Sequence, residues 1–558
     1  MSKRPSAAGT SKRPRQPKQL GLQLAVINRP SIAPSPYQQE IFHFVVAGSG
    51  DGLIVAAAGA GKTATLVECA QLLRADKTLF LAFNRHIAQE LQRRLANTEV
   101  EVLTVHGLGL RTIAKALGEP IVDKRKYRPL VGTWIDAHVA RSGRPGAMAA
   151  APRAAEQIQD WYEALEALVH FARLTLTDPT DGDALWGLAR RFGVRAGAWL
   201  LPGVEAVLEE GVQVAEQTHR VDYTDLLWLP HRLELKPQRY KHVLVDECQD
   251  LNAAQLALVL KTRARGGRML FCGDPHQSIF GWMGADPEAY ARIQTITQAT
   301  ELPLSISYRC PAAHIALAQT LVPTIEARPD APLGTITLME DSELFDHVRP
   351  GDLVICRKTA PLVEWCIALL ASKIPARVRG RELVTDLTAL ARKLARRVPW
   401  YRFPEAVSAY EEREVARMVR EEVDAEQILA VQDRCAVLRV CFRSFGARTV
   451  EALCAEINAL FDDSAGFVSL STIHRAKGLE AERVFVLEAN TLPLSWSGQR
   501  PDQAEQERNL LYVALTRAKQ DLFLLQAPEK TTWNELWNAA FAAARGRGYE
   551  LPEPGAAG

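Results

Sequence analysis

The segment from residue 56 to residue 63 has the residue types and spacing of a phosphate-binding loop. It reads Ala-Ala-Ala-Gly-Ala-Gly-Lys-Thr, follows the apolar run Leu53–Val55 and opens a predicted helix. Small residues allow backbone N–H groups to surround phosphate oxygens at a helix N-terminus. Lys62 is then expected to reach the β- and γ-phosphates, and the Thr63 hydroxyl to bind Mg²⁺. The plainer alternative is a strand-to-helix turn with an exposed lysine, since Ala56 stands where the usual pattern has its first glycine.

A second group of polar residues follows another apolar run, Val243–Val245. The chain continues there as Asp246-Glu247-Cys248-Gln249-Asp250. Two adjacent carboxylates at the end of a buried strand are costly unless a cation lies beside them. Mg²⁺-ATP supplies that charge, with Asp246 holding the metal and Glu247 orienting and deprotonating the attacking water. A single acidic pair can also be an N-capping turn, but the upstream phosphate loop favours an ATPase.

The composition is that of a soluble globular protein, with 558 residues of which 47% are hydrophobic and 24% charged. Lys plus Arg total 67 against 65 for Asp plus Glu. This balance does not exclude nucleic acid, because acidic surface elsewhere can offset a basic groove. The nine cysteines include no Cys-x-x-Cys pair, which argues against a zinc ribbon or a disulfide framework.

The sequence also bears on where the protein works. No apolar run approaches the ~18 residues that a membrane helix needs, and the amino terminus is a poor signal peptide. We therefore expect an intracellular protein with no membrane partner. It would be cytoplasmic, or nuclear if the source is eukaryotic.

The elements that must position the polar groups are short apolar runs that alternate with helical stretches from Pro34 onward. This alternation predicts an α/β fold with mostly parallel sheets covered by helices. Two long stretches with helical periodicity, residues 109–219 and 379–463, interrupt this alternation. They indicate two α/β cores, each carrying a helical insertion. The expected strands are Leu53–Ala57, Thr78–Phe83, His242–Val245, Met269–Cys272, Asp352–Cys356, Phe467–Ser471, Val484–Glu488 and Asp521–Leu525.

Eight segments, in the same order along the chain, resemble the signature motifs of the UvrD/Rep helicases of superfamily 1A. The most specific runs from Gly273 to Ala285 and reads Gly-Asp-Pro-His-Gln-Ser-Ile-Phe-Gly-Trp-Met-Gly-Ala. The short insertions resemble those of compact phage and F-box-helicase-like members. The other segments are Pro36–Glu40, the phosphate loop, Thr104–Gly107, Asp246–Asp250, Leu304–Arg309, Ser471–Glu480 and Glu507–Ala518.

The resemblance implies two RecA-like P-loop motor domains that share one ATP site. In this family Gln277 would sense the γ-phosphate from the first core, and Arg309 and Arg517 would act from the second. The catalytic residues would be Lys62, Glu247, Gln277, Arg309 and Arg517, with Thr63 and Asp246 as metal ligands. The nucleotide-binding residues would be Gln38, Gly59, Ala60, Gly61, Lys62, Thr63, Tyr308 and Glu480, with Gln38 and Tyr308 at the adenine and Glu480 at the ribose.

A track for single-stranded DNA follows from the same resemblance. Phe280 and Trp282 lie just after Gln277, and aromatic rings can stack on bases without reading their sequence. Core packing is the alternative, and it is the commoner outcome for isolated aromatic residues. The sequence departs from the family pattern at two positions. Met283 stands where an Arg is usual. Phe83 lies one position later than the aromatic residue of many relatives, so the sequence does not decide which way its side chain points. The predicted DNA-binding residues are Phe83, Asn84, Thr104, His106, Phe280, Trp282, Thr472 and His474.

A basic stretch in the second insertion has two interpretations. Arg392, Lys393, Arg396 and Arg397 recur at helical spacing ahead of an aromatic pair, Trp400-Tyr401. The helix could lie along duplex phosphates, or it could present an ordinary solvated face.

The expected domain organisation follows these boundaries. The basic tail carries no acidic residue and is expected to be disordered. The divisions are a tail at 1–28, a first RecA-like ATPase domain at 29–108 and 220–304, a helical insertion at 109–219, a second RecA-like domain at 305–378 and 464–527, a second helical insertion at 379–463, and a C-terminal helix and tail at 528–558.

The function implied by the resemblance is that of an ATP-dependent DNA helicase. It would use ATP and Mg²⁺, bind single-stranded and tailed duplex DNA, and move 3′ to 5′ in replication, repair or recombination. The alternative is a DNA-stimulated ATPase that remodels protein–DNA complexes without processive unwinding. Both use the same motor, so the motifs do not separate them.

Overall fold

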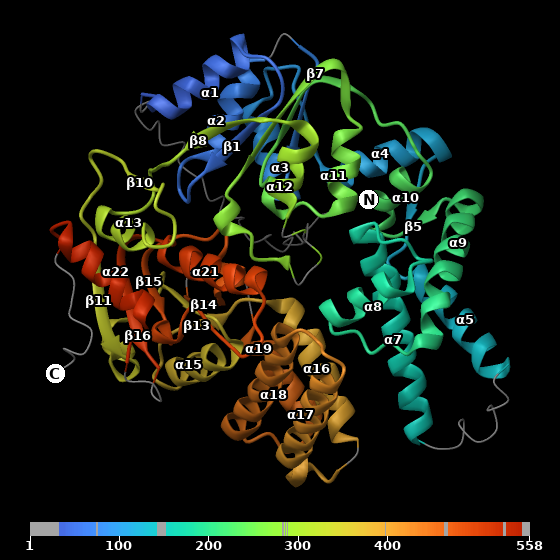
Figure 1. Cartoon of the computed structure of the whole chain (residues 1–558). Coiled ribbons are helices and arrows are strands. Elements are labelled where there is room, and N and C mark those ends of the chain that lie inside the picture. The colour runs from blue at the N-terminus through green and yellow to red at the C-terminus, as the bar shows by residue number, and fades with distance from the viewer. Residues whose placement is uncertain are drawn as a thin grey trace, which may run out of the picture.

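The computed structural model describes residues 33–73, 76–141, 152–281, 284, 286, 288–396, 398–461, 467–527 and 532–549. Two six-stranded sheets form the centres of two α/β cores, one at the top and one at the lower left of Figure 1. The strand pairs of both sheets run parallel. The α/β fold with two parallel-sheet cores is therefore confirmed. The tail expected at 1–28 lies outside the described residues.

The first sheet has the strand order β3-β2-β6-β7-β1-β8. Its four central strands match the four predicted ones, and β2 is buried at every residue, as expected of a strand covered on both faces. The two edge strands were not predicted, because they are short and partly polar, and β8 contains Pro303, which an edge tolerates. The bounds are β1 Gly52–Ala56, β2 Thr78–Ala82, β3 Glu101–Thr104, β6 Tyr240–Val245, β7 Arg263–Gly273 and β8 Thr300–Leu304.

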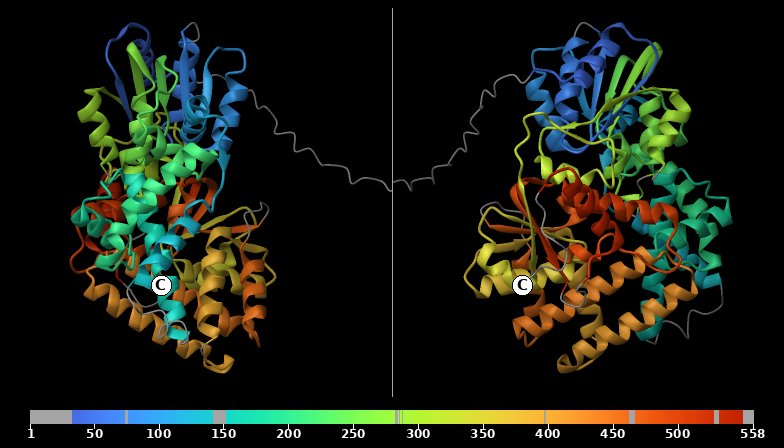
Figure 2. Two further views of the ribbon diagram at one scale, coloured as in Figure 1. Left: turned by 90° about the vertical axis from the view of Figure 1, so that its right-hand side faces the viewer. Right: turned by 60° about the vertical axis from the view of Figure 1, so that its left-hand side comes forward.

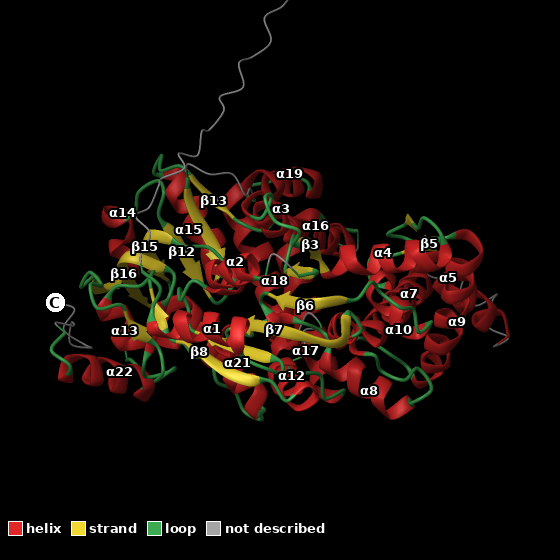
Figure 3. Ribbon diagram, turned by 90° about the horizontal axis from the view of Figure 1, so that it is seen from above, coloured by secondary structure: helices red, strands yellow, loops and turns green. Residues whose placement is uncertain are grey.

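Helices cover this sheet (Figure 3). Helix α1 begins with a capping box, in which the Ser35 hydroxyl accepts from the Gln38 amide and the Gln38 side chain accepts from the Ser35 amide. The helices of this core are α1 Pro36–Ala47, α2 Lys62–Leu72, α3 Arg85–Arg94, α11 Ala253–Leu260 and α12 Ala289–Thr297.

The second sheet has the order β11-β16-β15-β12-β14-β13, and its four predicted strands occupy the four inner positions. The outermost strands β11 and β13 were not predicted. The strand bounds are β11 Thr335–Glu340, β12 Leu353–Cys356, β13 Ala376–Val378, β14 Val468–Thr472, β15 Ala481–Val486 and β16 Ala518–Gln526. The helices are α13 Ala312–Ala318, α15 Thr359–Ala371, α20 Ile473–Ala476, α21 Pro501–Leu515 and α22 Glu535–Gly546.

The first insertion has a hydrophobic cluster of its own, separate from that of either sheet. A buried group of charges also ties its helices together, because Lys126 and Arg173 both pair with the fully buried Asp225. The helices of this part of the chain are α4 Val105–Leu117, α5 Tyr127–Arg141, α7 Pro152–Thr175, α8 Gly182–Arg191, α9 Leu201–Thr218 and α10 Asp225–Arg232, of which α4 crosses the predicted boundary at 109 and α10 lies beyond the one at 219.

The second insertion packs differently, because its helices share one hydrophobic cluster with a face of the second sheet. Figure 2 shows these orange helices below the second core and beside the cyan and green helices of the first insertion. The helices are α16 Arg381–Ala395, α17 Phe403–Arg420, α18 Ala425–Phe445 and α19 Val450–Leu460.

Two further findings concern the cysteines and the helices. All nine cysteines are buried and free. Among the described residues, no helix combines the length and the apolar character that a membrane crossing demands.

Candidate ATP site and nucleic-acid track

The phosphate loop joins β1 to α2 and takes a shape that its glycines permit. Gly59 and Gly61 both have left-handed φ angles, 73° and 80°, a region that side chains disfavour. A Cβ atom on Gly59 would also lie 2.7 Å from side-chain atoms of Ser307 and Arg309. The loop therefore lies directly against the segment that leads into the second core, and this contact is one part of the junction between the cores.

The predicted phosphate and metal residues meet in one group. The Thr63 hydroxyl donates to Asp246 Oδ2 at 2.8 Å, and Lys62 Nζ lies 3.2 Å from Glu247 Oε1. Because α2 follows β1, and the acidic pair follows β6, both pairs stand at the carboxyl ends of parallel strands in one sheet. The sheet thus brings together residues about 180 positions apart in sequence.

The backbone and the charge of Glu247 are both unusual. Its φ of 52° and ψ of 44° place it in the left-handed region, which costs energy for a residue with a side chain and is common at functional sites. Burial alone would raise the pKa of Glu247, but the ammonium groups of Lys62 and Lys477 lower it. Burial and the charge of Glu247 raise the pKa of Asp246. Glu247 is therefore the more readily ionised carboxyl of the pair.

A chain of hydrogen bonds leads from Glu247 to Gln277. Gln249 Nε2 donates to Glu247 Oε2 at 2.5 Å, and Gln249 Oε1 accepts from the Asp274 amide at 3.1 Å. Asp274 Oδ2 in turn accepts from Gln277 Nε2 at 2.5 Å. The buried Gln277 is thus connected to the acidic pair through Gln249 and Asp274. No role had been predicted for these two linking residues.

The predicted nucleotide residues of the second core reach the phosphate loop. The Tyr308 amide donates to the Gly59 carbonyl at 2.9 Å. Arg309 Nε lies 2.6 Å from Glu480 Oε2, so the residues predicted at the γ-phosphate and at the ribose form an ion pair with each other. Gln38 Nε2 donates at 3.0 Å to the hydroxyl of Thr65 in the first turn of α2, which places Gln38 close to the phosphate loop.

Arg517 is a buried cation, with 1% of its surface exposed. Its guanidinium donates to the carbonyls of Val513 and Leu479 and to the Thr516 hydroxyl. Among the described residues no carboxylate forms an ion pair with it. Burial, and then the nearby Arg309 guanidinium, lower the pKa of Arg517 to about 10. A guanidinium held in this way favours an approaching anion, because unpaired buried charge is costly.

Lys477 lies within the helicase-like segment Ser471–Glu480, but its role does not follow from the sequence. Its ammonium donates to both carboxylate oxygens of Asp250, at 2.8 and 2.6 Å, and to the Gln277 carbonyl at 2.5 Å. It also lies 5.1 Å from the centre of the Phe280 ring. Lys477 belongs to the second core and its partners to the first, so one buried side chain links the two. Sequence spacing alone does not indicate such a contact across 227 positions.

Four of the predicted DNA-binding residues lie at the carboxyl ends of the neighbouring strands β2 and β3. Asn84 and Thr104 accept backbone N–H groups at the starts of α3 and α4, at 2.9 and 3.0 Å. Phe83 is 46% exposed, and burial lowers the pKa of the partly buried His106. These strands form the edge of the sheet beside β6, so the proposed track adjoins the ATP site.

The remaining track residues have mixed surroundings. Thr472 ends β14 in the second core, and His474 is buried in α20, which lowers its pKa. Phe280 is half-buried beneath Lys477. Trp282 and Met283 lie outside the described residues. The stacking and phosphate-gripping roles of all these residues stay predictions.

The basic stretch of the second insertion takes part in a contact with the first. Lys393 Nζ lies 3.2 Å from Asp160 Oδ1, and Arg195 contacts both Asp160 and Glu414. Trp400 is partly buried against the hydrophobic cluster of the second insertion, and its indole N–H donates to the Ala447 carbonyl at 2.7 Å. Lys393 thus faces a carboxylate here, and Arg397 lies outside the described residues.

The arrangement is that of a P-loop protein whose candidate nucleotide site is built from two parallel-sheet cores. Comparison with protein families agrees with this class. Residues 37–297 match the UvrD/REP helicase N-terminal domain, and residues 447–529 match the UvrD-like helicase C-terminal domain. The chain belongs to the UvrD/Rep-like helicase family.

Curated relatives are distant and mostly longer. The chain is 24% identical over 523 residues to F-box DNA helicase protein 1 of Schizosaccharomyces pombe, covering 84% of this chain and 55% of that protein. It is 23% identical over 431 residues to DNA helicase II of Haemophilus influenzae, covering 56% and 59%. It is also 23% identical over 654 residues to ATP-dependent DNA helicase UvrD1 of Mycobacterium tuberculosis, covering 87% and 81%. The chain thus spans little more than half the length of the first two of these relatives.

Proposed function

We propose that this chain is an ATP-dependent DNA helicase that moves 3′ to 5′ on single-stranded DNA and unwinds duplex DNA in replication, repair or recombination. The observation that carries the proposal is the junction between the cores. A phosphate loop and an acidic pair come from one core, and a buried arginine without a carboxylate partner among the described residues comes from the other. Such a site needs both cores to act on one triphosphate.

The residues present fit Mg²⁺-ATP. Magnesium in such sites is held by one or two protein oxygens, the phosphates and water, and Thr63 Oγ1 and Asp246 Oδ2 already lie 2.8 Å apart. When bound, the ion would offset phosphate charge. Glu247 would orient the attacking water and accept its proton. Lys62 would leave Glu247 for the phosphates, and Arg309 and Arg517 would stabilise the developing charge, an effect worth about 10³ to 10⁵ in rate for an arginine finger.

The link to DNA would run through the Gln277 element. The Gln277 carbonyl accepts from Lys477, and the Lys477 ammonium lies over Phe280, which is a predicted stacking residue. Loss of the γ-phosphate from the Gln277 side chain would therefore alter contacts within a few residues of the proposed DNA track. Stacking holds bases without sequence preference, at about 1–3 kcal/mol per base, which suits a translocating motor.

The proposal also covers the domain division given above, with boundaries 29–108 and 220–304 for the first motor domain and 305–378 and 464–527 for the second. A hydrophobic cluster formed largely by residues of the first insertion supports the division between that insertion and the first core. The proposed partners are single-stranded and tailed duplex DNA. The proposed location is intracellular, at the nucleoid or in a nucleus.

Strand displacement on tailed duplexes tests the activity and its direction together. Opening a duplex costs about 1.4 kcal/mol per base-pair step, so the motor needs a single-stranded loading tail. A 3′-tailed duplex should open with ATP and Mg²⁺, while 5′-tailed and blunt duplexes should open much less. A preference for the 5′ tail would contradict the assigned polarity. DNA-stimulated ATP hydrolysis without opening of any substrate, together with removal of a bound protein, would favour the remodelling ATPase.

A further inference from the structure

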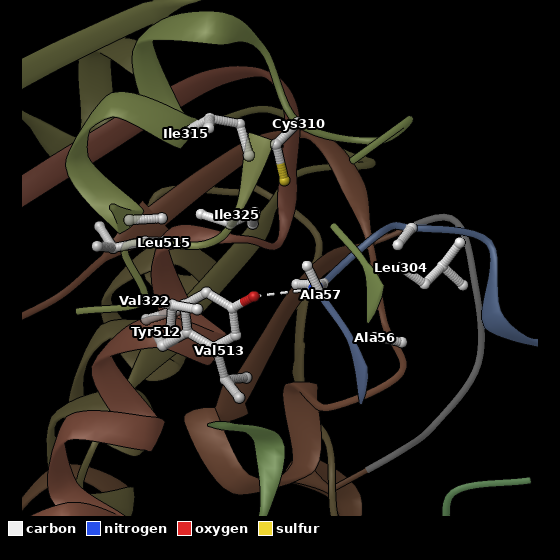
Figure 4. Packing of buried hydrophobic residues seen from close by; sticks show 14 of the residues in the cluster. Ala56, Ala57, Leu304, Cys310, Ile315, Val322, Ile325, Tyr512, Val513 and Leu515 are labelled. Atoms are coloured by element: carbon white, nitrogen blue, oxygen red, sulfur yellow. Dashed lines mark hydrogen bonds between the residues drawn. The ribbon is translucent and has the colours of Figure 1, made fainter. Parts of the chain in front are cut away.

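Helix α21 of the second core contacts the phosphate loop of the first through Tyr512. The Tyr512 side chain is fully buried, and its hydroxyl accepts a hydrogen bond from the Ala58 amide at 2.8 Å. Figure 4 shows the ring beside Val322, with its hydroxyl directed at the loop. The ring alone would fill this space. The hydroxyl adds a specific bond to a backbone group of the loop.

The same helix contacts the Gln277 element through Asn509. Asn509 Nδ2 donates to the Ser278 carbonyl at 3.2 Å and lies 3.5 Å from the Pro275 carbonyl. These two carbonyls flank Gln277, and Asn509 is 5% exposed. Residues one helical turn apart on α21 therefore contact the two first-core elements that would surround the triphosphate.

Arg517 is fixed to the end of this helix. Its Nε donates to the Val513 carbonyl at 2.9 Å, and its Nη2 donates to the Thr516 hydroxyl at 3.0 Å. That hydroxyl donates to the Tyr512 carbonyl at 2.8 Å. A guanidinium tied to the helix backbone moves with the helix. The place of α21 on the first core thus decides where Arg517 stands.

We propose that Tyr512 and Asn509 are positioning residues that set the register of α21 on the first core and so aim Arg517 at the ATP site. The proposal rests on the proposed ATPase function and assigns it two further residues. Catalytic geometry must hold to about 0.5 Å, and misplacements of about 1 Å can cost about 100-fold in rate. Imprecise placement of α21 on the first core would therefore lower kcat more than it would weaken ATP binding.

The variant Tyr512→Phe keeps the ring and removes only the hydroxyl. We expect its kcat for DNA-stimulated ATP hydrolysis to fall about threefold to tenfold, the range that follows from the net worth of one hydrogen bond. KM for ATP, DNA affinity and Tm should stay close to wild type. Tyr240→Phe is the matched control, because it also removes a buried hydroxyl, bonded to Glu101 at 2.5 Å on a different part of the first core. Asn509→Leu should resemble Tyr512→Phe.

A double-mutant cycle with Arg517→Lys shows whether Tyr512 acts through Arg517. If it does, Tyr512→Phe should cost little once Arg517 is changed, because contacting residues that act as a unit are not additive. Additive losses, an unchanged kcat in Tyr512→Phe, or a loss confined to ATP binding would each overturn the proposal.

Amide hydrogen exchange at Ala58 tests the contact without relying on activity. Exchange should be faster in Tyr512→Phe and unchanged in Tyr240→Phe, and equal protection in both would show that the bond is not made. If wild-type protein hydrolyses no ATP with DNA, the proposed function fails and this proposal fails with it. If wild type is active and Tyr512→Phe matches it, only the positioning role fails.

Discussion

Two of the contacts between the halves of the chain differ in burial. At the junction between the cores, Lys477 and Asp250 form an ion pair whose side chains are 10% and 2% exposed. At the contact between the insertions, Lys393 and Asp160 form a pair whose side chains are 37% and 24% exposed. Both contacts are therefore ion pairs between a lysine and an aspartate, but the first pair is largely shielded from water and the second is partly exposed to it.

Burial determines what each contact can do. Removing one partner of a buried pair leaves an uncompensated charge and typically costs about 3–5 kcal/mol. An exposed pair is worth about 0–1 kcal/mol and is screened by salt. A substitution that removes one partner is therefore expected to cost more at the junction between the cores than at the contact between the insertions.

The largest effect is expected in the acidic pair and phosphate loop of the junction. Lys62→Ala and Glu247→Gln should both reduce DNA-stimulated ATP hydrolysis by at least about 100-fold, since general-base catalysis alone contributes about 10² to 10⁴. They should differ in binding, because Lys62 contacts phosphate in the ground state and Glu247→Gln keeps the shape of the site. Nucleotide titration should show weak binding for the first and near-normal binding for the second.

The matched control for this pair is Glu456→Gln, an exposed residue of α19. Equal loss of ATP binding in Lys62→Ala and Glu247→Gln would contradict the roles assigned to them.

A direct comparison of the two contacts comes next in size. Lys477→Met should lower the free energy of unfolding by about 3–5 kcal/mol, because it strands a buried carboxylate. Lys393→Met, the matched change at the contact between the insertions, should cost less than about 1 kcal/mol. Denaturant unfolding measures both values. Similar values would mean that burial does not separate the two contacts.

The pH dependence of stability should reveal the buried partner. Burial raises the pKa of Asp250 to about 6, although Lys477 opposes the shift. The folded protein then keeps this proton while the unfolded chain loses it near pH 4, so stability should fall as pH rises from about 4 to about 6. The loss from this group is at most about 3 kcal/mol. Asp250→Asn should remove that part of the slope, and an unchanged slope in denaturant unfolding would argue against it.

The smallest effect is expected at Asp160, which pairs with both Lys393 and Arg195 at the contact between the insertions. Asp160→Asn should change the free energy of unfolding by less than about 1 kcal/mol in low salt. The difference should vanish near 1 M salt, where the screening length is about 3 Å. A salt-independent loss would place this contact in the same class as the buried junction.

Much of the fold could be predicted from the sequence because each central strand is a local signal. Leu53–Val55 and Val243–Val245 are apolar runs followed by polar loops, and both are strands in the first sheet. Edge strands such as β8 were not predicted. Half-buried strands mix polar and apolar residues, and whether they form depends on packing against neighbouring strands.

The sequence by itself determined the phosphate loop, the acidic pair and the order of the motifs, because these chemistries need particular residue types at fixed short spacing. Only the tertiary structure decided which distant residues meet. The contacts of Lys477 with Asp250 and of Tyr512 with Ala58 join positions more than 200 residues apart. Such contacts depend on how the two cores pack against each other, and no local pattern encodes that packing.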